Sequence, residues 1–275
     1  MYTIQSMKRM DTSWGGVADW YDDLLTKEKT NYQKDLVLPN LTRLMDTKPG
    51  EKILDLACGQ GFFSFEFAKS GAEVVGVDIA SELIKIASLQ ATSSKLEAVF
   101  KVAPADKLDF IQSGTIDKIA IVLAIQNIEN LDGVFKECAR VLKSGGLGSP
   151  KLSSDSVGGK LFLVMNHPAF RIPKQSSWAW DETQKNQYRR IDGYMSESRE
   201  KIDMHPGVKV KDYTVSFHRP LQVYFKALAK HGLAVSRLEE WVSNRKSEPG
   251  PRAVAENAIR KEIPLFLALE VVKLF

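Results

Sequence analysis

A glycine-rich turn and two acidic residues form the first pattern in the chain that could do chemistry. Asp55 lies near the end of an apolar segment, the turn CGQG follows at 58–61, and Asp78 lies near the end of the next apolar segment, 72–80. Glycine lets the backbone turn tightly and approach a ligand, and the N–H groups of a following helix then point at that ligand. The pattern predicts a site for a nucleotide-like cofactor.

Two common nucleotide sites fit the turn poorly. A dinucleotide-binding enzyme would show GxGxxG, but Phe62 and Phe63 follow Gly61, and the phosphate-binding pattern GxxxxGK[ST] does not occur in the sequence. An NAD-dependent dehydrogenase is therefore a distant alternative.

The elements that must position this turn alternate in type. From residue 51 to about 164, short apolar runs alternate with amphipathic stretches, as expected for βαβ units and a parallel sheet. The chain closes with a helix at 219–232 and apolar runs at 233–243 and 263–275. The predicted strands are 52–57, 72–80, 96–106, 116–124, 160–166, 233–243 and 263–275. The prediction is one α/β domain over 1–275.

Three segments interrupt this pattern. Residues 144–159 are rich in Gly and Ser and predict a surface loop, with a substrate lid as the alternative. Residues 167–214 are polar, charged and aromatic without clear periodicity, so we expect an inserted substrate cap after the fifth strand. Residues 245–262 predict a solvated excursion with a short helix.

Several motifs resemble those of the class I S-adenosylmethionine (SAM)-dependent methyltransferases. They are DLACGQG (55–61, with Ala57 in place of the first glycine), GVDIA (76–80), APAD (103–106), IDKIAIVLAIQNIEN (116–130) and VLKSGG (141–146). The resemblance implies a Rossmann-like, doubly wound, seven-stranded sheet, mostly parallel with an antiparallel last strand, and an N-terminal helical cover over 1–48. It implies SAM as the cofactor and S-adenosylhomocysteine as its product.

The same resemblance implies roles for individual residues. Asp55 would lie near the SAM amino group, Asp78 would accept hydrogen bonds from the ribose hydroxyls, and Asp106 would meet the adenine amino group. Tyr21, in the N-terminal segment, would touch SAM or belong to the core. The predicted cofactor-binding residues are Tyr21, Asp55, Ala57, Cys58, Gly59, Gly61, Asp78, Ile79, Ala105, Asp106, Leu123 and Gln126.

The methyl acceptor is less defined. A general base is needed only if the acceptor has a proton to lose, and histidine titrates near neutrality. His167 follows the fifth strand and is one candidate base, or only a strand-exit residue; His218 is another. Arg219 could bind an acidic acceptor or pair with a carboxylate. Trp178 and Tyr194 could wall the acceptor site or form a core of the cap.

The composition of the chain limits the kinds of partner that we expect it to bind. The net charge is only +4 over 38 basic and 34 acidic residues, which gives little support for nucleic-acid binding. No apolar run reaches the roughly 20 residues of a membrane span. The N-terminus lacks the apolar core of a secretory signal, so we expect a cytoplasmic protein. The two cysteines, Cys58 and Cys138, show no metal-ligand spacing, and no metal site is predicted.

These observations favour a methyltransferase that acts on a small molecule. An RNA methyltransferase is the nearest alternative, but the stretch LAIQNIEN (123–130) lacks the (D/N)PPY pattern of base-amino methyltransferases. A nonenzymatic SAM sensor or silent partner subunit is a further alternative. The expected assembly is a monomer or a homodimer.

Overall fold

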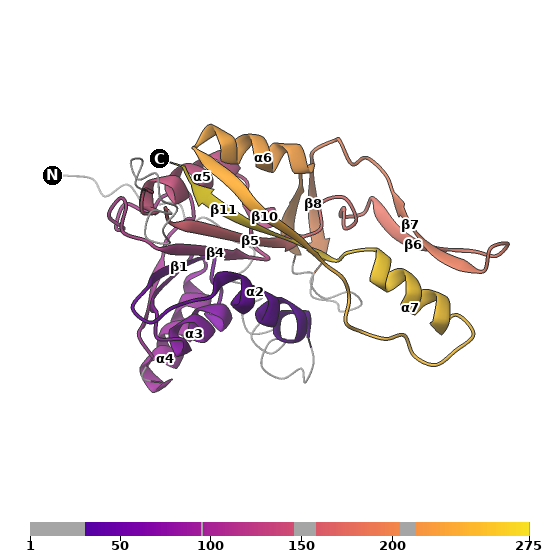
Figure 1. Ribbon diagram of the computed structural model, residues 1–275, viewed down its shortest axis with the longest axis horizontal. Coiled ribbons are helices and arrows are strands. Elements are labelled where there is room, and N and C mark those ends of the chain that lie inside the picture. Colours follow the sequence, from indigo (N-terminus) through magenta and orange to yellow (C-terminus); the bar gives the residue numbers. More distant parts are fainter. Residues whose placement is uncertain (1–30, 95, 146–157, 204–212, 275) are drawn as a thin grey trace, which may run out of the picture.

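A seven-stranded sheet forms the centre of the molecule (Figure 1). The computed structural model describes residues 31–94, 96–145, 158–203 and 213–274. The strand order is β10-β11-β5-β4-β1-β2-β3. The strands are β1 (Lys52–Leu56), β2 (Glu73–Asp78), β3 (Ala98–Val102), β4 (Lys118–Val122), β5 (Lys160–Asn166), β10 (Leu233–Trp241) and β11 (Phe266–Lys273).

The direction of the strands agrees with the sequence prediction. All strand pairs from β3 to β5 are parallel, and the last strand, β11, is antiparallel to both β5 and β10. The expected Rossmann-like sheet, mostly parallel with an antiparallel last strand, is confirmed. In such a sheet the loops at the carboxyl ends of the parallel strands meet at one edge, where ligands bind.

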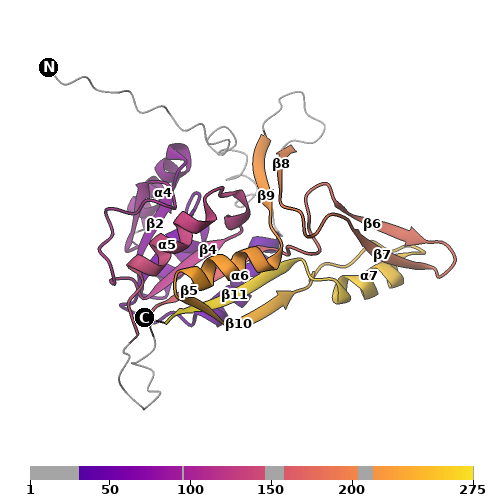
Figure 2. The same ribbon diagram turned by 90° about the horizontal axis from the view of Figure 1, so that it is seen from above.

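Helices cover both faces of the sheet (Figures 1 and 2). On one face lie η2 (Gln33–Val37), α2 (Leu38–Met45), α3 (Phe62–Lys69) and α4 (Ser81–Ser94); on the other lie α5 (Leu131–Val141) and α6 (Leu221–Lys230). Strand residues alternate between the two cores, so that Ile119 and Ile121 of β4 face α5 while Ala120 and Val122 face α2 and α3. Burial on both faces explains the continuously apolar strands of the sequence.

The predicted cap contains more regular structure than the sequence indicated. Two antiparallel hairpins fill it, one of β6 (Ser176–Asp181) and β7 (Asn186–Ile191), the other of β8 (Ser198–Asp203) and β9 (Tyr213–His218). The described part of the cap thus continues past residue 214 to His218. Its strands are half-exposed and rich in charge, so they lack the apolar alternation that reveals a strand in a sequence.

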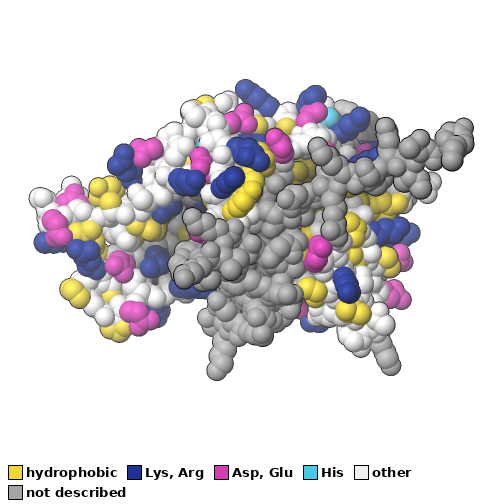
Figure 3. Space-filling view, turned by 180° about the vertical axis from the view of Figure 1, so that it is seen from behind, with side chains coloured by type: hydrophobic (Ala, Val, Ile, Leu, Met, Phe, Trp, Pro, Cys, Tyr) yellow, Lys and Arg dark blue, Asp and Glu magenta, His cyan; other side chains and the backbone are white. Residues whose placement is uncertain are grey.

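The first hairpin leaves the body of the molecule beside α7 (Ala253–Glu262), as Figure 2 shows. The Arg252 guanidinium lies 4.6 Å from the ring centroid of Trp180 and joins the two elements. Helix α7 has no buried residue, as expected for a solvated excursion. Basic and acidic side chains are interspersed over the visible described surface (Figure 3). No helix of the described residues is long and apolar enough to cross a membrane.

Candidate active site

The turn after β1 has a backbone that favours glycine. Gly59 and Gly61 have φ of +57° and +87°, and a Cβ at Gly61 would lie 2.9 Å from the ring of Phe100. Ala57, in the first glycine position of the motif, also has positive φ, +61°. The turn therefore adopts the usual left-handed backbone even where a side chain is present, at some conformational cost.

Asp78 holds this turn against the end of β2. Its Oδ2 accepts a hydrogen bond from the Gly59 N–H at 2.9 Å, and its Oδ1 accepts one from the Ala80 N–H at 2.9 Å. Burial raises the pKa of Asp78, and these backbone hydrogen bonds oppose that rise. Each carboxylate oxygen has two acceptor sites, so both oxygens retain capacity for a ligand's hydroxyls.

Asp55 lies deeper in the same site and is 2% exposed. The Ser64 hydroxyl, in α3, donates a 2.5 Å hydrogen bond to its Oδ2. Burial raises the pKa of Asp55 to about 7, the nearby Asp78 charge adds to the rise, and the Ser64 hydrogen bond opposes it. A carboxyl group with such a pKa would bind a proton or a cationic ligand group near neutral pH.

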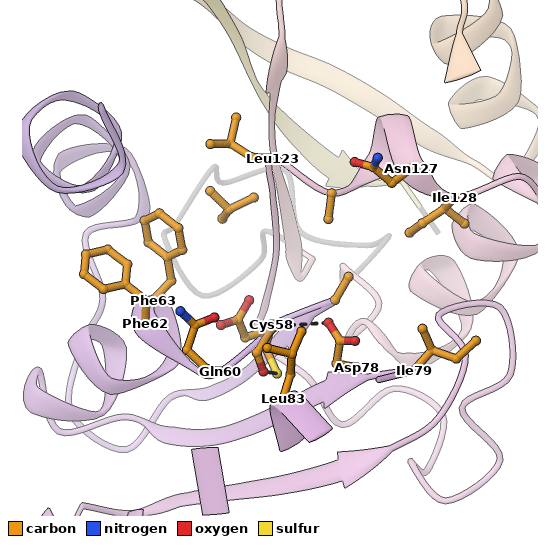
Figure 4. Close-up of a pocket in the computed structure, with 15 residues that line it drawn as sticks. Cys58, Gln60, Phe62, Phe63, Asp78, Ile79, Leu83, Leu123, Asn127 and Ile128 are labelled. Atoms are coloured by element: carbon orange, nitrogen blue, oxygen red, sulfur yellow. Dashed lines mark hydrogen bonds between the residues drawn. The ribbon is translucent and has the colours of Figure 1, made fainter. Parts of the chain in front are cut away.

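These residues line a pocket at the carboxyl ends of β1, β2 and β4, which we call the nucleotide pocket (Figure 4). It encloses about 770 Å³ of space, including its open mouth. Its walls are mostly apolar, with a few polar groups among them. It is lined by Asp55, Ala57, Cys58, Gly59, Gln60, Phe62, Phe63, Asp78, Ile79, Leu83, Val122, Leu123, Ala124, Asn127 and Ile128.

Seven of the predicted cofactor residues thus meet in this pocket: Asp55, Ala57, Cys58, Gly59, Asp78, Ile79 and Leu123. The sequence analysis missed other lining residues, among them Gln60, Phe62, Phe63 and Asn127. Gln60 lies within the glycine turn, Phe62 and Phe63 follow it, and Asn127 lies five residues after β4. Closeness to a strand's carboxyl end is the signal that could have identified them.

Other predicted cofactor residues lie beside the pocket. Gly61 shapes the turn from behind, and Ala105 packs against the core of α5. Asp106 accepts a 2.6 Å hydrogen bond from Asn130, the N-cap residue of α5. Tyr21 lies outside the described residues, as do residues 1–30 of the predicted N-terminal cover and residues 146–157 of the predicted loop. The adenine role of Asp106 stays a prediction.

Gln126 faces a second cavity, which we call the lateral cleft. The cleft encloses about 300 Å³ at the carboxyl ends of β4 and β5, against the second hairpin. It is lined by Gln126, Asn166, Pro168, Arg171, Pro173, Ser216, Phe217, His218, Arg219 and Tyr224. The short helix η3 (Ile125–Asn127) separates the two cavities, because Asn127 lines the nucleotide pocket and Gln126 lines the cleft.

His167, one of the two predicted bases, is held by hydrogen bonds at both ring nitrogens. The Ala169 N–H donates to Nδ1 at 3.2 Å, and Nε2 lies 2.7 Å from a carboxylate oxygen of Glu240. The ring is 2% exposed and lines neither cavity. Burial lowers the pKa of His167, opposed by Glu240. The geometry favours a neutral ring that donates from Nε2 and has no free nitrogen for a substrate.

His218, the other predicted base, lines the lateral cleft with Arg219. Its Nε2 donates to the backbone oxygen of Tyr194 at 2.8 Å, which leaves Nδ1 as the acceptor nitrogen of the neutral ring. Tyr194 also accepts, through its hydroxyl, a 3.1 Å hydrogen bond from the Leu221 N–H. Trp178 lies on the first hairpin, where Arg189 stacks 5.1 Å from its ring, and it lines neither cavity.

The remaining reactive groups are buried. Burial raises the pKa of both cysteine thiols, Cys58 and Cys138, and neither forms a disulfide. No group of three or more His, Cys, Asp or Glu side chains that could hold a metal ion occurs among the described residues.

Known proteins match the part of the chain that builds the nucleotide pocket. Residues 54–148 match the family model described as "Methyltransferase domain". A ubiquinone biosynthesis O-methyltransferase from Xanthomonas oryzae is 32% identical over 97 residues, 35% of this chain and 41% of that protein. One from Bordetella avium is 28% identical over 129 residues, 47% and 54% of the two chains. The chain thus spans about half the length of these relatives, or less.

Solved structures match over most of the chain. A SAM-dependent methyltransferase from Mesorhizobium loti superposes with a TM-score of 0.67 at 23% identity, covering 88% of this chain and all of that one. A putative one from Listeria monocytogenes gives 0.64 at 22% identity, covering 86% and 97%. At such identities the likeness concerns the fold. Residues 54–148 thus match a methyltransferase domain, and this match, together with the fold, the glycine turn and the two acidic strand ends, supports a class I SAM-dependent methyltransferase.

Proposed function

We propose that this protein transfers a methyl group from SAM to a small-molecule acceptor and releases S-adenosylhomocysteine. The observation that carries the proposal is the arrangement of Asp78 at the end of β2 against the left-handed turn at Gly59. When bound, SAM supplies a methyl group on a positively charged sulfur, so the protein has mainly to position the acceptor.

The residues of the nucleotide pocket suit SAM chemically. Asp78 has unused acceptor capacity for ribose hydroxyls. Asp55, with its pKa raised to about 7 by burial, suits the ligand's ammonium group, which would favour the charged carboxylate. The Gln60 Nε2 is buried without a hydrogen-bond partner among the described residues, and it would donate to a ligand carboxylate. Apolar walls from Phe63, Ile79 and other residues would exclude water.

A small acceptor is supported by the second cavity. The lateral cleft lies across the short helix η3 from the nucleotide pocket, and the Gln126 Nε2 donates a 2.6 Å hydrogen bond to the carbonyl of Leu123, in the pocket wall. The relatives named above are O-methyltransferases of ubiquinone biosynthesis, which also favours a small acceptor. On the face shown in Figure 3, basic and acidic side chains are mixed, which gives no support to an RNA substrate.

The first test is isothermal titration of the full chain with SAM, S-adenosylhomocysteine and NADH. We expect micromolar binding of the two adenosyl ligands, no binding of NADH, and at least a hundredfold loss in Asp78→Ala. Asp78→Asn, which keeps one acceptor oxygen, should lose less. Asp109→Ala, at an exposed carboxylate that pairs with Lys107, is the matched control and should bind as the natural chain does. Binding of NADH alone would refute the proposal.

A further inference from the structure

The lateral cleft is a positively charged cavity. Its lining includes the guanidinium groups of Arg171 and Arg219, and no aspartate or glutamate belongs to the lining that the structure describes. The exposed Glu197, whose carboxylate is 3.9 Å from the Arg219 Nε, is a nearby countercharge outside it. Cationic side chains that gather in a cavity without carboxylates favour an anionic ligand.

Hydrogen bonds fix the Arg219 side chain, and one of its donor nitrogens is left without a hydrogen bond of good geometry among the described residues. It is 6% exposed, and its second terminal nitrogen, Nη2, donates to the backbone oxygens of Ile128 at 2.9 Å and Glu129 at 2.8 Å. Its other terminal nitrogen, Nη1, is buried and makes no hydrogen bond of good geometry with the described residues, and the guanidinium lies beside the Tyr224 hydroxyl. A buried donor without a partner destabilises the unliganded fold, and a ligand oxygen would remove that cost.

Arg171 supplies a second positive charge, and no carboxylate pairs with it among the residues that the structure describes. Its side chain forms no ion pair or hydrogen bond with the residues that the structure describes, and its guanidinium lies over the Phe266 ring, 5.4 Å from the centroid. The residue is partly open to solvent. Loss of water around the guanidinium, together with the nearby Arg189 charge, lowers the pKa of Arg171. An anion between Arg171 and Arg219 would satisfy both guanidinium groups, which match carboxylate and phosphate oxygens well.

The cleft also lies close to the proposed cofactor. Arg219 holds the backbone oxygen of Ile128, which lines the nucleotide pocket, and the Asn127 side chain donates a 2.8 Å hydrogen bond to the backbone oxygen of Val215, next to the cleft residue Ser216. The unpartnered Gln126 Oε1, buried in the same wall, could accept a hydrogen bond from an acceptor's N–H or O–H.

From this arrangement we infer that the lateral cleft binds the methyl acceptor and that the acceptor carries a carboxylate or phosphate group held by Arg171 and Arg219. The inference rests on the proposed function, since it assigns a substrate class to the same site. Gln126, Ser216 and His218 would then contact the uncharged part of the acceptor.

The test uses three matched probes, benzoate, phenyl phosphate and neutral benzamide, titrated by ligand-observed NMR against the full chain with and without S-adenosylhomocysteine. We expect at least one anionic probe to bind tenfold or more tightly than benzamide. The two anionic probes distinguish a carboxylate from a phosphate. Arg171→Gln should reduce the preference to near unity, and Arg219→Lys, which keeps the charge but loses the planar donors, should weaken it.

Arg190→Gln is the matched control, because Arg190 lies on the neighbouring hairpin, is 66% exposed and pairs with Asp192. It should bind the probes as the natural chain does. If S-adenosylhomocysteine binds but the anionic probes bind no more tightly than benzamide, the inference is overturned. The same holds if Arg171→Gln and Arg190→Gln change probe binding equally. Loss of S-adenosylhomocysteine binding in the natural chain would instead contradict the proposed function, and the probe titration without that ligand would still decide the anion preference.

Discussion

Ser64, in the first turn of α3, donates a 2.5 Å hydrogen bond to Asp55, near the end of β1, and among the described residues no other side chain hydrogen-bonds to this buried carboxyl. One hydroxyl compensates little of the cost of burying a charge. This is why burial dominates and raises the pKa of Asp55 to about 7.

The first prediction concerns the stability of the unliganded protein. The folded pKa of Asp55, about 7, is above its unfolded value, so the folded state binds the additional proton and the destabilisation grows between about pH 4 and pH 7. Asp55→Asn keeps an acceptor for Ser64 and has no charge to bury. It should be more stable than the natural chain by about 1–3 kcal/mol at pH 8, and by less at pH 5. Urea unfolding at both pH values would measure this. A difference in the free energy of unfolding between variant and natural chain that does not change with pH would contradict the prediction.

The second prediction concerns ligand affinity. The ammonium group of S-adenosylhomocysteine would favour the ionised form of Asp55, so binding should tighten by up to about tenfold between pH 6 and pH 8. Titration calorimetry at several pH values would follow it. The pH dependence should be much smaller in Asp55→Asn, and an equal dependence in that variant would assign the titration to another group.

The third prediction concerns Ala57, whose φ is +61°. Ala57→Gly removes the conflict between Cβ and the left-handed backbone, although glycine also loosens the unfolded chain. The net expectation is a gain of about 0.5 kcal/mol in the free energy of unfolding. Ala91→Gly, within helix α4, is the control of opposite sign and should lose about 1 kcal/mol. Chemical denaturation measures both, and a loss in Ala57→Gly would refute the argument.

The fourth prediction concerns Gly76, in the middle of β2. A Cβ there would lie 2.5 Å from two ring carbons of Phe100 and 3.0 Å from the Cys58 sulfur. Gly76→Ala should therefore cost about 1–3 kcal/mol, seen as a lower Tm. Adding Phe100→Ala should remove most of the additional cost. Gly250→Ala, whose nearest contact would be 4.0 Å away, is the control and should change stability by less than about 0.5 kcal/mol.

The fifth prediction concerns His167, whose two ring nitrogens are both hydrogen-bonded. His167→Ala should cost about 1–3 kcal/mol at pH 7.5 through the lost hydrogen bonds. Since burial lowers the pKa of His167 in the fold, the natural chain loses stability as the pH falls below about 6.5, and the gap to the variant should narrow at pH 5. Unfolding at both pH values tests this, and Glu240→Gln, which keeps an acceptor, should cost less. A gap that widens at low pH would contradict the neutral ring.

Local pattern in the sequence was enough to predict the sheet and the core of the nucleotide pocket. Strands buried on both faces must be continuously apolar, and a turn with left-handed backbone selects glycine at positions such as Gly59. Parallel strands bring their carboxyl ends to one edge, so Asp55 and Asp78 could be placed together from their positions alone. These features follow from rules that act within a few residues.

Tertiary structure alone decided the roles of residues whose partners are distant in the chain. His167 and Glu240 are 73 residues apart, and their hydrogen bond removes the histidine from the lateral cleft. Gln126 and Asn127 are neighbours in sequence, yet the turn of η3 directs them to different cavities. The polar hairpins of the cap have little apolar alternation, because only part of each strand is buried against the body. A sequence shows residue types and their spacing. Which residues are buried, and which distant residues contact one another, is decided by tertiary packing.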